Sequence, residues 1–454
     1  MSITDQLTAN LPKGRVLDDP ESLLAYGYDG GTWLTGKPDV VVNIHSEAEA
    51  VIVLRLAKEQ HVPVFPRGAA SGLAGGSVPQ GGIVLNFATM REILEIDEES
   101  LMAVVEPGVV TNDFHAAVEA RGLFYPPDPA SLKQSTLGGN VSTGAGGPRC
   151  LKYGTTREYV RGTHAVLPGG QVIVDGGKYL KNASGYNLSQ LLVGSEGTLA
   201  AITQVTLRLL PKPPATGTVL ALFPKLEDAA AMVTRILQAG ILPSVIEFMD
   251  RQCIRCIEEA SNLGLPTDIE ALILIECDGH PATVDAELAH ITELCAANGA
   301  REVERATDED TREKLWKARR SVSPSLSRLR PSKLGEDISL PRRAIVPVVK
   351  RMQQIAAEYN VLLPTFGHIG DGNLHPNLVF DPRDEEEVAR VAKAAEALIA
   401  VAVEYGGTLS GEHGIGLLKK DYLPLAVPQQ NLALFRQLKA VFDPTNIMNP
   451  GKVF

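Results

Sequence analysis

The sequence is poor in several features that define common classes of protein. It has 2 tryptophans and 5 cysteines in 454 residues, and aromatic side chains make up 5% of the chain. No segment approaches the roughly 20 continuous apolar residues that a membrane-spanning helix needs. The formal net charge is −11, without a basic run or interleaved aromatic residues. The sequence therefore argues against a transmembrane protein and against broad nucleic-acid binding.

The cysteines are odd in number and scattered, which fits a reducing compartment better than a disulfide framework. Cys253 and Cys256 form a single C-x-x-C, which we interpret as packing residues rather than a zinc or redox pair. The first fifteen residues lack the basic and apolar regions of a secretion signal. We therefore expect a cytoplasmic protein, and peripheral contact with the inner face of a membrane is compatible with this expectation.

Two histidines flank a strong turn signal. Asp371 and Gly372 lie between two apolar runs, and Asp-Gly is typical of a two-residue type I′ hairpin turn. This turn predicts a hairpin in which His368 directly faces His375, with Asn377 on the same face. Opposed residues have Cβ atoms about 4.5–5.5 Å apart, from which two imidazoles can converge on one cation. The alternative is a pair of structural histidines.

A third metal ligand is available in the glycine-flanked sequence 410–416, which contains Glu412 and His413. Two histidine nitrogens and one carboxylate leave open positions on a divalent metal, as in catalytic rather than closed structural sites. We predict that His368, His375 and Glu412 bind the metal, with zinc and manganese as the first candidates. His413 is then available as a base.

Three glycine-rich stretches, 66–77, 135–147 and 192–199, lie next to predicted strands. The first follows a predicted helix, 46–60, with Ser46 as its N-cap. Small side chains expose successive N–H groups that can bind phosphate without a lysine. The first stretch matches neither a P-loop nor a Rossmann fingerprint, and alone it is equally compatible with a flexible turn. Together the three indicate a large phosphate-bearing cofactor.

Prolines at 211–214 mark a boundary, after which strands and helices alternate. The expected order suits a ferredoxin-like cap. Its expected strands are 218–223, 244–248 and 271–277, and its helices are 226–238 and 282–297. Further helices are expected at 308–330, 342–359, 384–405 and 429–442.

The glycine-rich stretches, together with 368–377, 411–416 and 449–451, resemble the FAD-linked oxidases of the vanillyl-alcohol oxidase superfamily. The chain is most similar to the branch with D-lactate dehydrogenase, D-2-hydroxyglutarate dehydrogenase and the catalytic subunit of glycolate oxidase. The resemblance implies an α+β fold with a two-subdomain FAD-binding domain, a ferredoxin-like cap and a C-terminal segment that returns to the flavin. The implied limits are 1–211 for the FAD-binding domain, 212–410 for the cap with the metal hairpin, and 411–454 for the C-terminal segment.

The resemblance also implies the FAD-binding residues. Superfamily members with covalent flavin often attach it through a histidine in the first loop, where this chain has Ala69-Ala70-Ser71, so we expect non-covalent FAD. The positions that match FAD contacts are Pro66, Arg67, Gly68, Ala69, Ala70, Ser71, Gly72, Pro129, Ser131, Gly138, Ser142, Glu196, Gly197, Ile202 and Asn449.

On the substrate side, Arg319 matches the arginine that binds the substrate α-carboxylate, and its planar fork suits bidentate recognition. Lys333 falls near a lysine that contacts substrate in the hydroxyglutarate enzymes. The sequence 334–336 departs from that group's pattern, so a small monocarboxylate fits better. Asn377 is expected to steady the hydroxyl or carboxylate.

The expected reaction is the metal-assisted oxidation of a small D-2-hydroxy acid, D-lactate or glycolate, to the 2-oxo acid. His413 takes the hydroxyl proton while the Cα hydride passes to flavin N5. Because the chain lacks an iron–sulfur cysteine cluster, electrons are expected to leave to a quinone, a cytochrome or a partner subunit. A homodimer is compatible with the sequence.

Four alternatives remain at this point. The first two are the catalytic subunit of a multi-component glycolate oxidase and a D-2-hydroxyglutarate dehydrogenase. The others are a metal-dependent hydrolase, which no HExxH motif supports, and a non-catalytic flavin-binding subunit.

Overall fold

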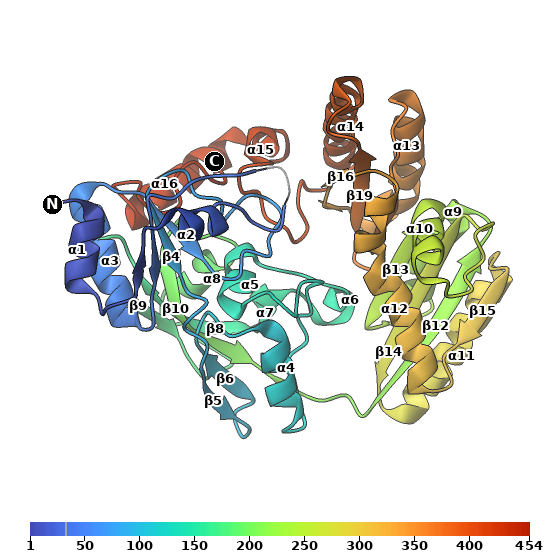
Figure 1. Ribbon diagram of the computed structural model, residues 1–454. Helices are drawn as coiled ribbons and strands as arrows, with labels where there is room; N and C mark the ends of the chain where they lie inside the picture. The colour runs from blue at the N-terminus through green and yellow to red at the C-terminus, as the bar shows by residue number, and fades with distance from the viewer. Residues whose placement is uncertain (32–33) are drawn as a thin grey trace. The chain divides into compact units, whose positions relative to one another are not determined.

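The computed structural model describes residues 1–31 and 34–454, which divide into two compact units (Figure 1). Unit 1 consists of Met1–Gly146, Thr155–Lys212 and Glu412–Phe454, and unit 2 consists of Gly147–Gly154 and Pro213–Gly411. The domain limits expected from the resemblance divide the chain by function and stay a prediction. Within the described residues, no helix combines the length and the apolar character needed to cross a membrane.

One layer of unit 1 is a four-stranded sheet in the order β1-β2-β4-β3. Its strands are β1 (Val16–Leu17), β2 (Val40–Asn43), β3 (Val64–Arg67) and β4 (Ile83–Asn86). β2, β4 and β3 are parallel, and their aliphatic side chains are buried. Burial on both faces explains why these strands are continuous apolar runs in the sequence. Helix α3 (Glu47–Gln60) joins β2 to β3, and the predicted N-cap Ser46 accepts a hydrogen bond from the Glu49 N–H.

The second layer of unit 1 is an antiparallel sheet in the order β5-β6-β10-β8-β9. Its strands are β5 (Ile93–Asp97), β6 (Met102–Val105), β8 (Val160–Val166), β9 (Val172–Gly176) and β10 (Ala201–Arg208). A separate pair joins β7 (Leu123–Phe124) to β11 (Leu210–Pro211).

The other helices of unit 1 are mostly short. They are α1 (Ile3–Asn10), α2 (Pro20–Ala25), α4 (Thr111–Glu119), α5 (Leu137–Thr143), α7 (Thr156–Tyr159), α8 (Leu188–Leu192), α15 (Leu423–Ala426) and α16 (Gln429–Phe442), with a 3-10 turn at Lys420–Tyr422. The bounds of α16 are those predicted from the sequence.

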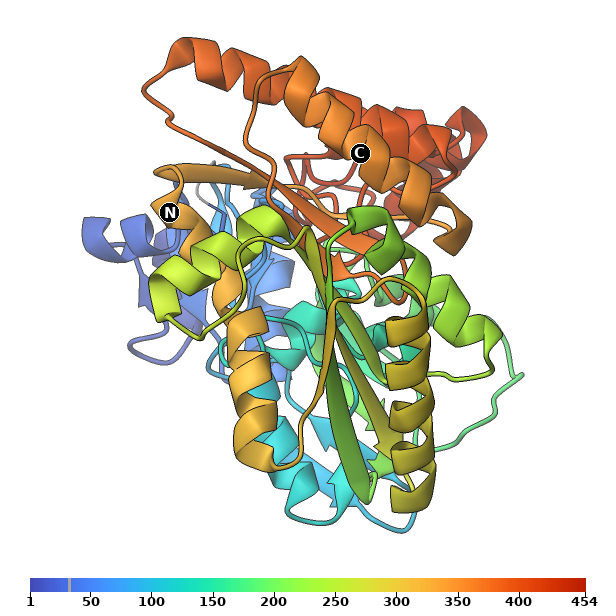
Figure 2. The same cartoon turned by 90° about the vertical axis from the view of Figure 1, so that its right-hand side faces the viewer.

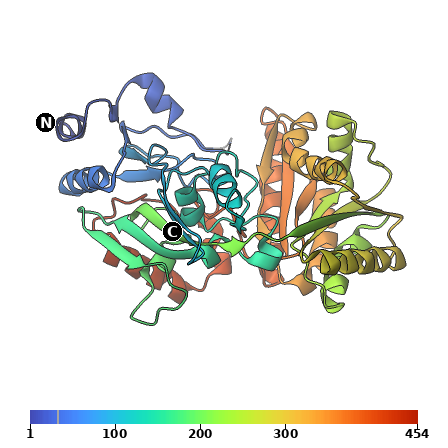
Figure 3. The same cartoon turned by 90° about the horizontal axis from the view of Figure 1, so that it is seen from below.

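The C-terminal segment is built into the first sheet of unit 1. The Val64 N–H donates to the carbonyl of Ile447, and the Asn449 N–H donates to the carbonyl of Val64. Ile447 and Met448 are buried in the same core as β2 and α3. Figure 3 shows the red C-terminal helices in the same unit as the blue and green N-terminal elements.

A buried carboxylate fixes one loop of this C-terminal segment. The Ile415 and Gly416 N–H groups donate to the two carboxylate oxygens of Glu196, at 2.7 and 2.8 Å. Burial raises the pKa of Glu196 to about 7, although these donors and nearby Lys452 favour the charged form. Gly416 has a φ of 53°, and a Cβ there would collide with the carbonyl of Ala74. The loop therefore has little freedom to move away from Glu196.

Unit 2 is built on one large sheet, in the order β15-β12-β14-β13-β18-β19-β16, with β17 also paired to β19. Its strands are β12 (Ala215–Phe223), β13 (Val245–Asp250), β14 (Ala271–Gly279), β15 (Glu302–Arg305), β16 (Ser332–Gly335), β17 (Ile338–Ser339), β18 (Thr365–His368) and β19 (Asn373–Phe380). Strands β12 to β15, in the sheet order β15-β12-β14-β13, form a ferredoxin-like fold together with the helices that follow β12 and β14. The β18–β19 hairpin extends this sheet beyond β13.

Helices cover both faces of this sheet, with α9 and α11 on one face and α10 and α12 on the other (Figure 2). The helices of unit 2 are α6 (Cys150–Tyr153), α9 (Leu226–Gln238), α10 (Arg251–Ser261), α11 (Pro281–Ala297), α12 (Glu309–Ser325), α13 (Ile345–Glu358) and α14 (Glu385–Glu404), with 3-10 turns at Leu326–Arg328 and Arg342–Ala344. Cys253 and Cys256 of α10 are free and buried in the apolar core, as their interpretation as packing residues requires.

The predicted register of the histidine hairpin is wrong. β18 and β19 pair Phe366 with His375 and His368 with Asn373, which leaves a four-residue loop, 369–372. A type I′ turn needs positive φ at both central residues, whereas within the sequence Asp371-Gly372 only the glycine has one, at 90°. Because the register shifts by two residues, both histidines still lie on the same face of the sheet, diagonally instead of directly opposed.

The short segment Gly147–Gly154 belongs to unit 2, although its neighbours in the sequence belong to unit 1. Asp278 of β14 holds it there. Lys152 Nζ donates to the Asp278 carboxylate and, at 2.7 Å, to its carbonyl, and the Tyr153 hydroxyl donates to the carboxylate at 2.8 Å.

The raised pKa of Glu196 predicts a pH dependence of stability. Because its folded pKa of about 7 lies above the ordinary 4.5, the folded protein binds more protons between these values. The contribution of Glu196 to stability is therefore present below pH 4.5 and lost as pH rises through 7, by about 3 kcal/mol at most. Glu196→Gln should flatten the fall of the unfolding midpoint over this range, measured by scanning calorimetry. The exposed Glu99→Gln is the control, and an unchanged slope in Glu196→Gln would contradict the assignment.

Candidate active site

A cavity that is open to solvent lies in unit 1. The three glycine-rich stretches of the sequence line it, and so do Glu412 and His413 of the C-terminal segment. The structure thus brings together, around one space, the predicted cofactor loops and the predicted base.

The first loop has the features of a phosphate cradle. Within the described chain, the N–H groups of Ala69, Ala70, Ser71 and Gly72 donate to no other residue, so they can serve a phosphate oxygen. A Cβ at Gly68 would collide with the Thr136 hydroxyl, so the neighbouring loop approaches closely. A diphosphate-bearing cofactor such as FAD therefore fits the residues present.

Fourteen of the fifteen residues predicted to contact FAD line this cavity, and Asn449 is the exception. Its Nδ2 donates to the carbonyls of Gly76 and Glu196, at 2.9 and 2.6 Å. Asn449 thereby holds together the backbones of the first and third glycine-rich loops. Its Oδ1 is buried and accepts no hydrogen bond from a described residue. The contacts of the fifteen residues with FAD themselves stay a prediction.

Arg67 lines the cavity, and its guanidinium is held by backbone. Its Nη1 donates to the carbonyl of Tyr28 at 2.7 Å, and the guanidinium carbon lies 5.3 Å from the centre of the Tyr26 ring. Burial lowers the pKa of Arg67. Arg67 thereby ties the start of the first loop to the segment before β2.

His413 and Glu412 occupy the loop that Glu196 fixes. The His413 Nε2 lies 3.8 Å from a carboxylate oxygen of Glu412, and about one fifth of the His413 side chain is exposed. An imidazole with this exposure at the cavity lined by the predicted cofactor loops is placed to exchange a proton with a bound molecule.

In unit 2, Arg319 and His368 share one carboxylate, that of Glu247, which was not predicted from the sequence. Glu247 of β13 is fully buried and accepts from Nε of Arg319 and, at 2.5 Å, from Nδ1 of His368. Burial alone would raise the pKa of Glu247, but the Arg319 guanidinium and the interaction with His368 hold it below its ordinary value. The signal in the sequence was a single charge within the apolar run of residues 245–249.

The second histidine also has a carboxylate beside it. His375 Nδ1 lies 3.7 Å from Asp337, and the centres of the His368 and His375 rings are 5.2 Å apart. Asp337 also accepts from Asn373 Nδ2 at 2.7 Å and from the Ser410 hydroxyl at 2.6 Å. Nothing in the sequence distinguished Asp337 from ordinary surface acids, because its partners are distant in the chain.

The donor set suits a divalent metal. Because Nδ1 of His368 is bonded to Glu247, a cation would have to bind this histidine through Nε2. The backbone of Gly411, the last residue of unit 2, packs against Asn373, where a Cβ would collide with the amide. Glu412 follows it in the chain but belongs to unit 1, so its place as the third ligand stays a prediction.

The remaining predicted substrate residues lie on β19 and on its partner strand. Asn377 follows His375 on the same face of β19, and its Nδ2 donates to the carbonyl of His375 at 2.7 Å. Lys333 of β16 donates to the hydroxyl of Ser323, one helical turn beyond Arg319 on α12. Burial lowers the pKa of Lys333.

Comparisons with known proteins agree with this architecture. Residues 38–176 match the family described as FAD binding domain, and residues 212–453 match FAD linked oxidases, C-terminal domain. Glycolate oxidase subunit GlcD of Bacillus subtilis is 44% identical over 438 residues, which are 96% of this chain and 93% of that protein. D-lactate dehydrogenase of Archaeoglobus fulgidus is 38% identical over 418 residues, which are 91% of this chain and 91% of that protein.

Among solved structures, p-cresol methylhydroxylase with substrate bound has a TM-score of 0.84 at 15% identity, over 99% of this chain and 96% of that one. A likeness at this identity shows the fold, and it confirms the predicted vanillyl-alcohol oxidase type. The family matches also argue against two of the alternatives from the sequence, the metal-dependent hydrolase and the non-catalytic flavin-binding subunit. The chain belongs to the FAD-linked oxidases and is an FAD-dependent oxidoreductase of the group that contains glycolate oxidase subunit GlcD and D-lactate dehydrogenase.

Proposed function

We propose that this protein oxidises a small D-2-hydroxy acid, D-lactate or glycolate, to the corresponding 2-oxo acid. The names of its relatives, glycolate oxidase subunit GlcD and D-lactate dehydrogenase, support this reaction class. The observation in this chain that carries the proposal is that His413 lines the same cavity as the FAD loops. Oxidation of an alcohol by hydride transfer needs a base for the hydroxyl proton beside the cofactor.

Arg319 is the proposed receptor for the substrate carboxylate. It is 8% exposed, and within the described chain its two terminal nitrogens donate to no residue, since only Nε is bonded to Glu247. A buried guanidinium with an open edge favours a bidentate anion. Phe366, whose ring centre lies 4.8 Å from the guanidinium carbon, forms an apolar wall against it.

His368, His375 and Glu412 are the proposed metal ligands, with Asn377 placed to steady the substrate. FAD would supply the two-electron acceptor, and a divalent metal would lower the pKa of the substrate hydroxyl. The proximity of both imidazoles, and the packing of Gly411 against Asn373, support this ligand set. The donors do not discriminate between zinc and manganese.

His413 is the proposed base. Its imidazole takes the hydroxyl proton as the C–H bond breaks, and its Nε2 lies 3.8 Å from a carboxylate oxygen of Glu412. The N–H groups of Ile415 and Gly416 donate to Glu196 and hold the loop in place, so orientation contributes to the rate.

The name of the 44% identical relative favours one variant of this proposal, in which the chain is the catalytic subunit of a glycolate oxidase complex. Electrons would then leave to a partner subunit, whereas a quinone or cytochrome would serve an independent dehydrogenase. Lys333 is bound to Ser323, which supports a small monocarboxylate over D-2-hydroxyglutarate.

The substrate is identified by the visible spectrum of the purified protein. We expect a flavin band that D-lactate or glycolate bleaches under anaerobic conditions, while L-lactate and D-2-hydroxyglutarate leave it largely oxidised. Bleaching by D-2-hydroxyglutarate alone would instead select the hydroxyglutarate enzyme. A protein that binds FAD but is bleached by no hydroxy acid, with metal and candidate partner added, would overturn the proposed reaction.

Replacing His413 by alanine should lower kcat by about 10²- to 10⁴-fold, because the proton then lacks its acceptor. FAD content and the unfolding midpoint should stay near those of the parent protein. His290→Ala, at an exposed position of α11, is the matched control. Turnover close to that of the parent would remove His413 from the role of base.

Metal removal tests the second part of the site. Dialysis against a chelator should leave the flavin spectrum in place but abolish bleaching by substrate, and addition of Zn²⁺ or Mn²⁺ should restore it. His368→Ala and His375→Ala should each lower the metal content measured by elemental analysis, while His290→Ala should not. Indifference of both activity and metal content to these changes would exclude a catalytic metal.

A further inference from the structure

Glu247 is the one described residue that bonds both to the proposed carboxylate receptor and to a proposed metal ligand. One carboxylate oxygen accepts from Nε of Arg319, and the other accepts from Nδ1 of His368. The carboxylate is 0% exposed, so it is not a surface ion pair whose geometry could vary.

We propose that Glu247 is a positioning residue that fixes the metal ligand His368 and the substrate-binding Arg319 relative to each other. This inference rests on the proposed function. A carboxylate at Nδ1 keeps the proton on that nitrogen, leaves the Nε2 lone pair for the metal and sets the rotation of the ring. The bond from Nε of Arg319 turns the opposite edge of the guanidinium, with its two terminal nitrogens, toward a bound anion.

The geometry matters because an α-hydroxy acid carries its hydroxyl and its carboxylate on adjacent carbons. A metal at the hydroxyl and a guanidinium at the carboxylate must therefore stand at a fixed separation. Two side chains from separate elements, α12 and β18, would not keep that separation by themselves. A single rigid acceptor between them does so, and errors near 1 Å in such sites are costly.

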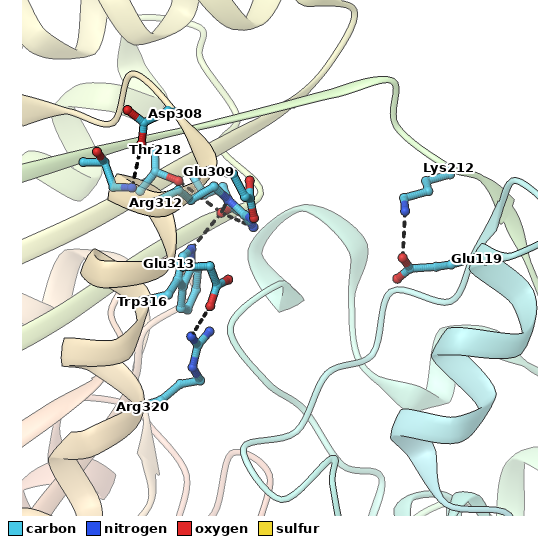
Figure 4. Close-up of polar contacts among 11 residues, drawn as sticks. Glu119, Lys212, Thr218, Asp308, Glu309, Arg312, Glu313, Trp316 and Arg320 are labelled. Atoms are coloured by element: carbon cyan, nitrogen blue, oxygen red, sulfur yellow. Dashed lines mark hydrogen bonds and ion pairs between the residues drawn. The ribbon is translucent and has the colours of Figure 1, made fainter.

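Helix α12, which carries Arg319, makes a second contact with a buried carboxylate, and this contact serves as a matched control. Glu276 of β14 is 2% exposed and accepts from Arg312 Nε at 3.1 Å and from Trp316 Nε1 at 2.8 Å. Figure 4 shows Arg312 and Trp316 on α12, next to Thr218 of β12. Arg312 precedes Arg319 by seven residues, two turns along the same helix face. This second buried pair has the stabilising role of an ion pair, but it orients neither a proposed metal ligand nor the proposed carboxylate receptor.

The test compares Glu247→Gln with Glu276→Gln in the full-length, FAD-loaded protein. An amide can accept from only one of the two donors and opposes the other with its own N–H groups. For Glu247→Gln we expect the affinity for Zn²⁺ or Mn²⁺, measured by chelator competition, to fall about 10- to 100-fold. The KM for the hydroxy acid should rise by a similar factor, while FAD affinity is unchanged. Glu276→Gln should lower the unfolding midpoint and leave metal affinity and KM unchanged.

A double variant separates positioning from general damage. If Glu247 acts on the metal through His368, then Glu247→Gln combined with His368→Ala should bind metal no more weakly than His368→Ala alone. If Glu247→Gln does not fold, Glu247→Asp keeps the charge but is one methylene too short to reach both donors, and it should show the same losses to a smaller degree.

Three outcomes would overturn the proposal: parent-like metal affinity and KM in the folded Glu247 variants, equal losses in Glu276→Gln, or additive losses in the double variant. These outcomes are distinct from a failure of the proposed function. In that case the parent protein itself would bind no metal and would not be reduced by a hydroxy acid.

Discussion

Two hydrogen bonds, from Ile415 and Gly416 to the buried carboxylate of Glu196, determine where the proposed base lies. Glu196 itself, in the middle of the third glycine-rich stretch, has a left-handed φ of 51°, an uncommon conformation for a residue with a side chain of its size. The strain and the burial of this acid are local costs. They are offset by a C-terminal loop that cannot leave the wall of the cavity without exposing two N–H groups and breaking contacts with Ala74.

Buried carboxylates recur as organising elements in both units. In unit 1, Glu196 holds a backbone loop, and in unit 2, Glu247 and Asp337 each lie beside one histidine. In each case a flexible element, a loop or an imidazole, receives its orientation from an acid on a more rigid element. In the proposed site this arrangement would separate two tasks: the imidazoles would bind the metal or take the proton, and the buried acids would set their directions.

Local patterns predicted the regular elements well. The bounds of α9 and α16 agree with those read from apolar spacing, and the Ser46 cap starts α3 as expected. The glycine-rich stretches predicted the cavity, because runs of small residues in a loop usually allow backbone or a ligand to approach closely.

The hairpin register could not be predicted, because the Asp-Gly signal describes a turn in isolation. In the protein, the Gly370 N–H donates instead to the carbonyl of Ile246 on β13. Glu247 and Asp337 were missed for a related reason, since their roles depend on partners 36 to 121 positions away in the chain.

The dispersal of unit 1 over three stretches of sequence has a consequence for how the protein folds during synthesis. The edge strand β3 donates one hydrogen bond to Ile447 and accepts one from Asn449, yet the main stretch of unit 2, Pro213–Gly411, is translated between β11 and this segment. At roughly 5–20 residues per second, the FAD-binding sheet waits on the order of 10 s or more for its last partner. Unit 2 needs only Gly147–Gly154 in addition to its main stretch, so it can finish first. The cofactor cavity is thus completed late, after the ribosome has passed Met448, and nascent chains that stop earlier would carry an open sheet edge exposed to chaperones and to aggregation.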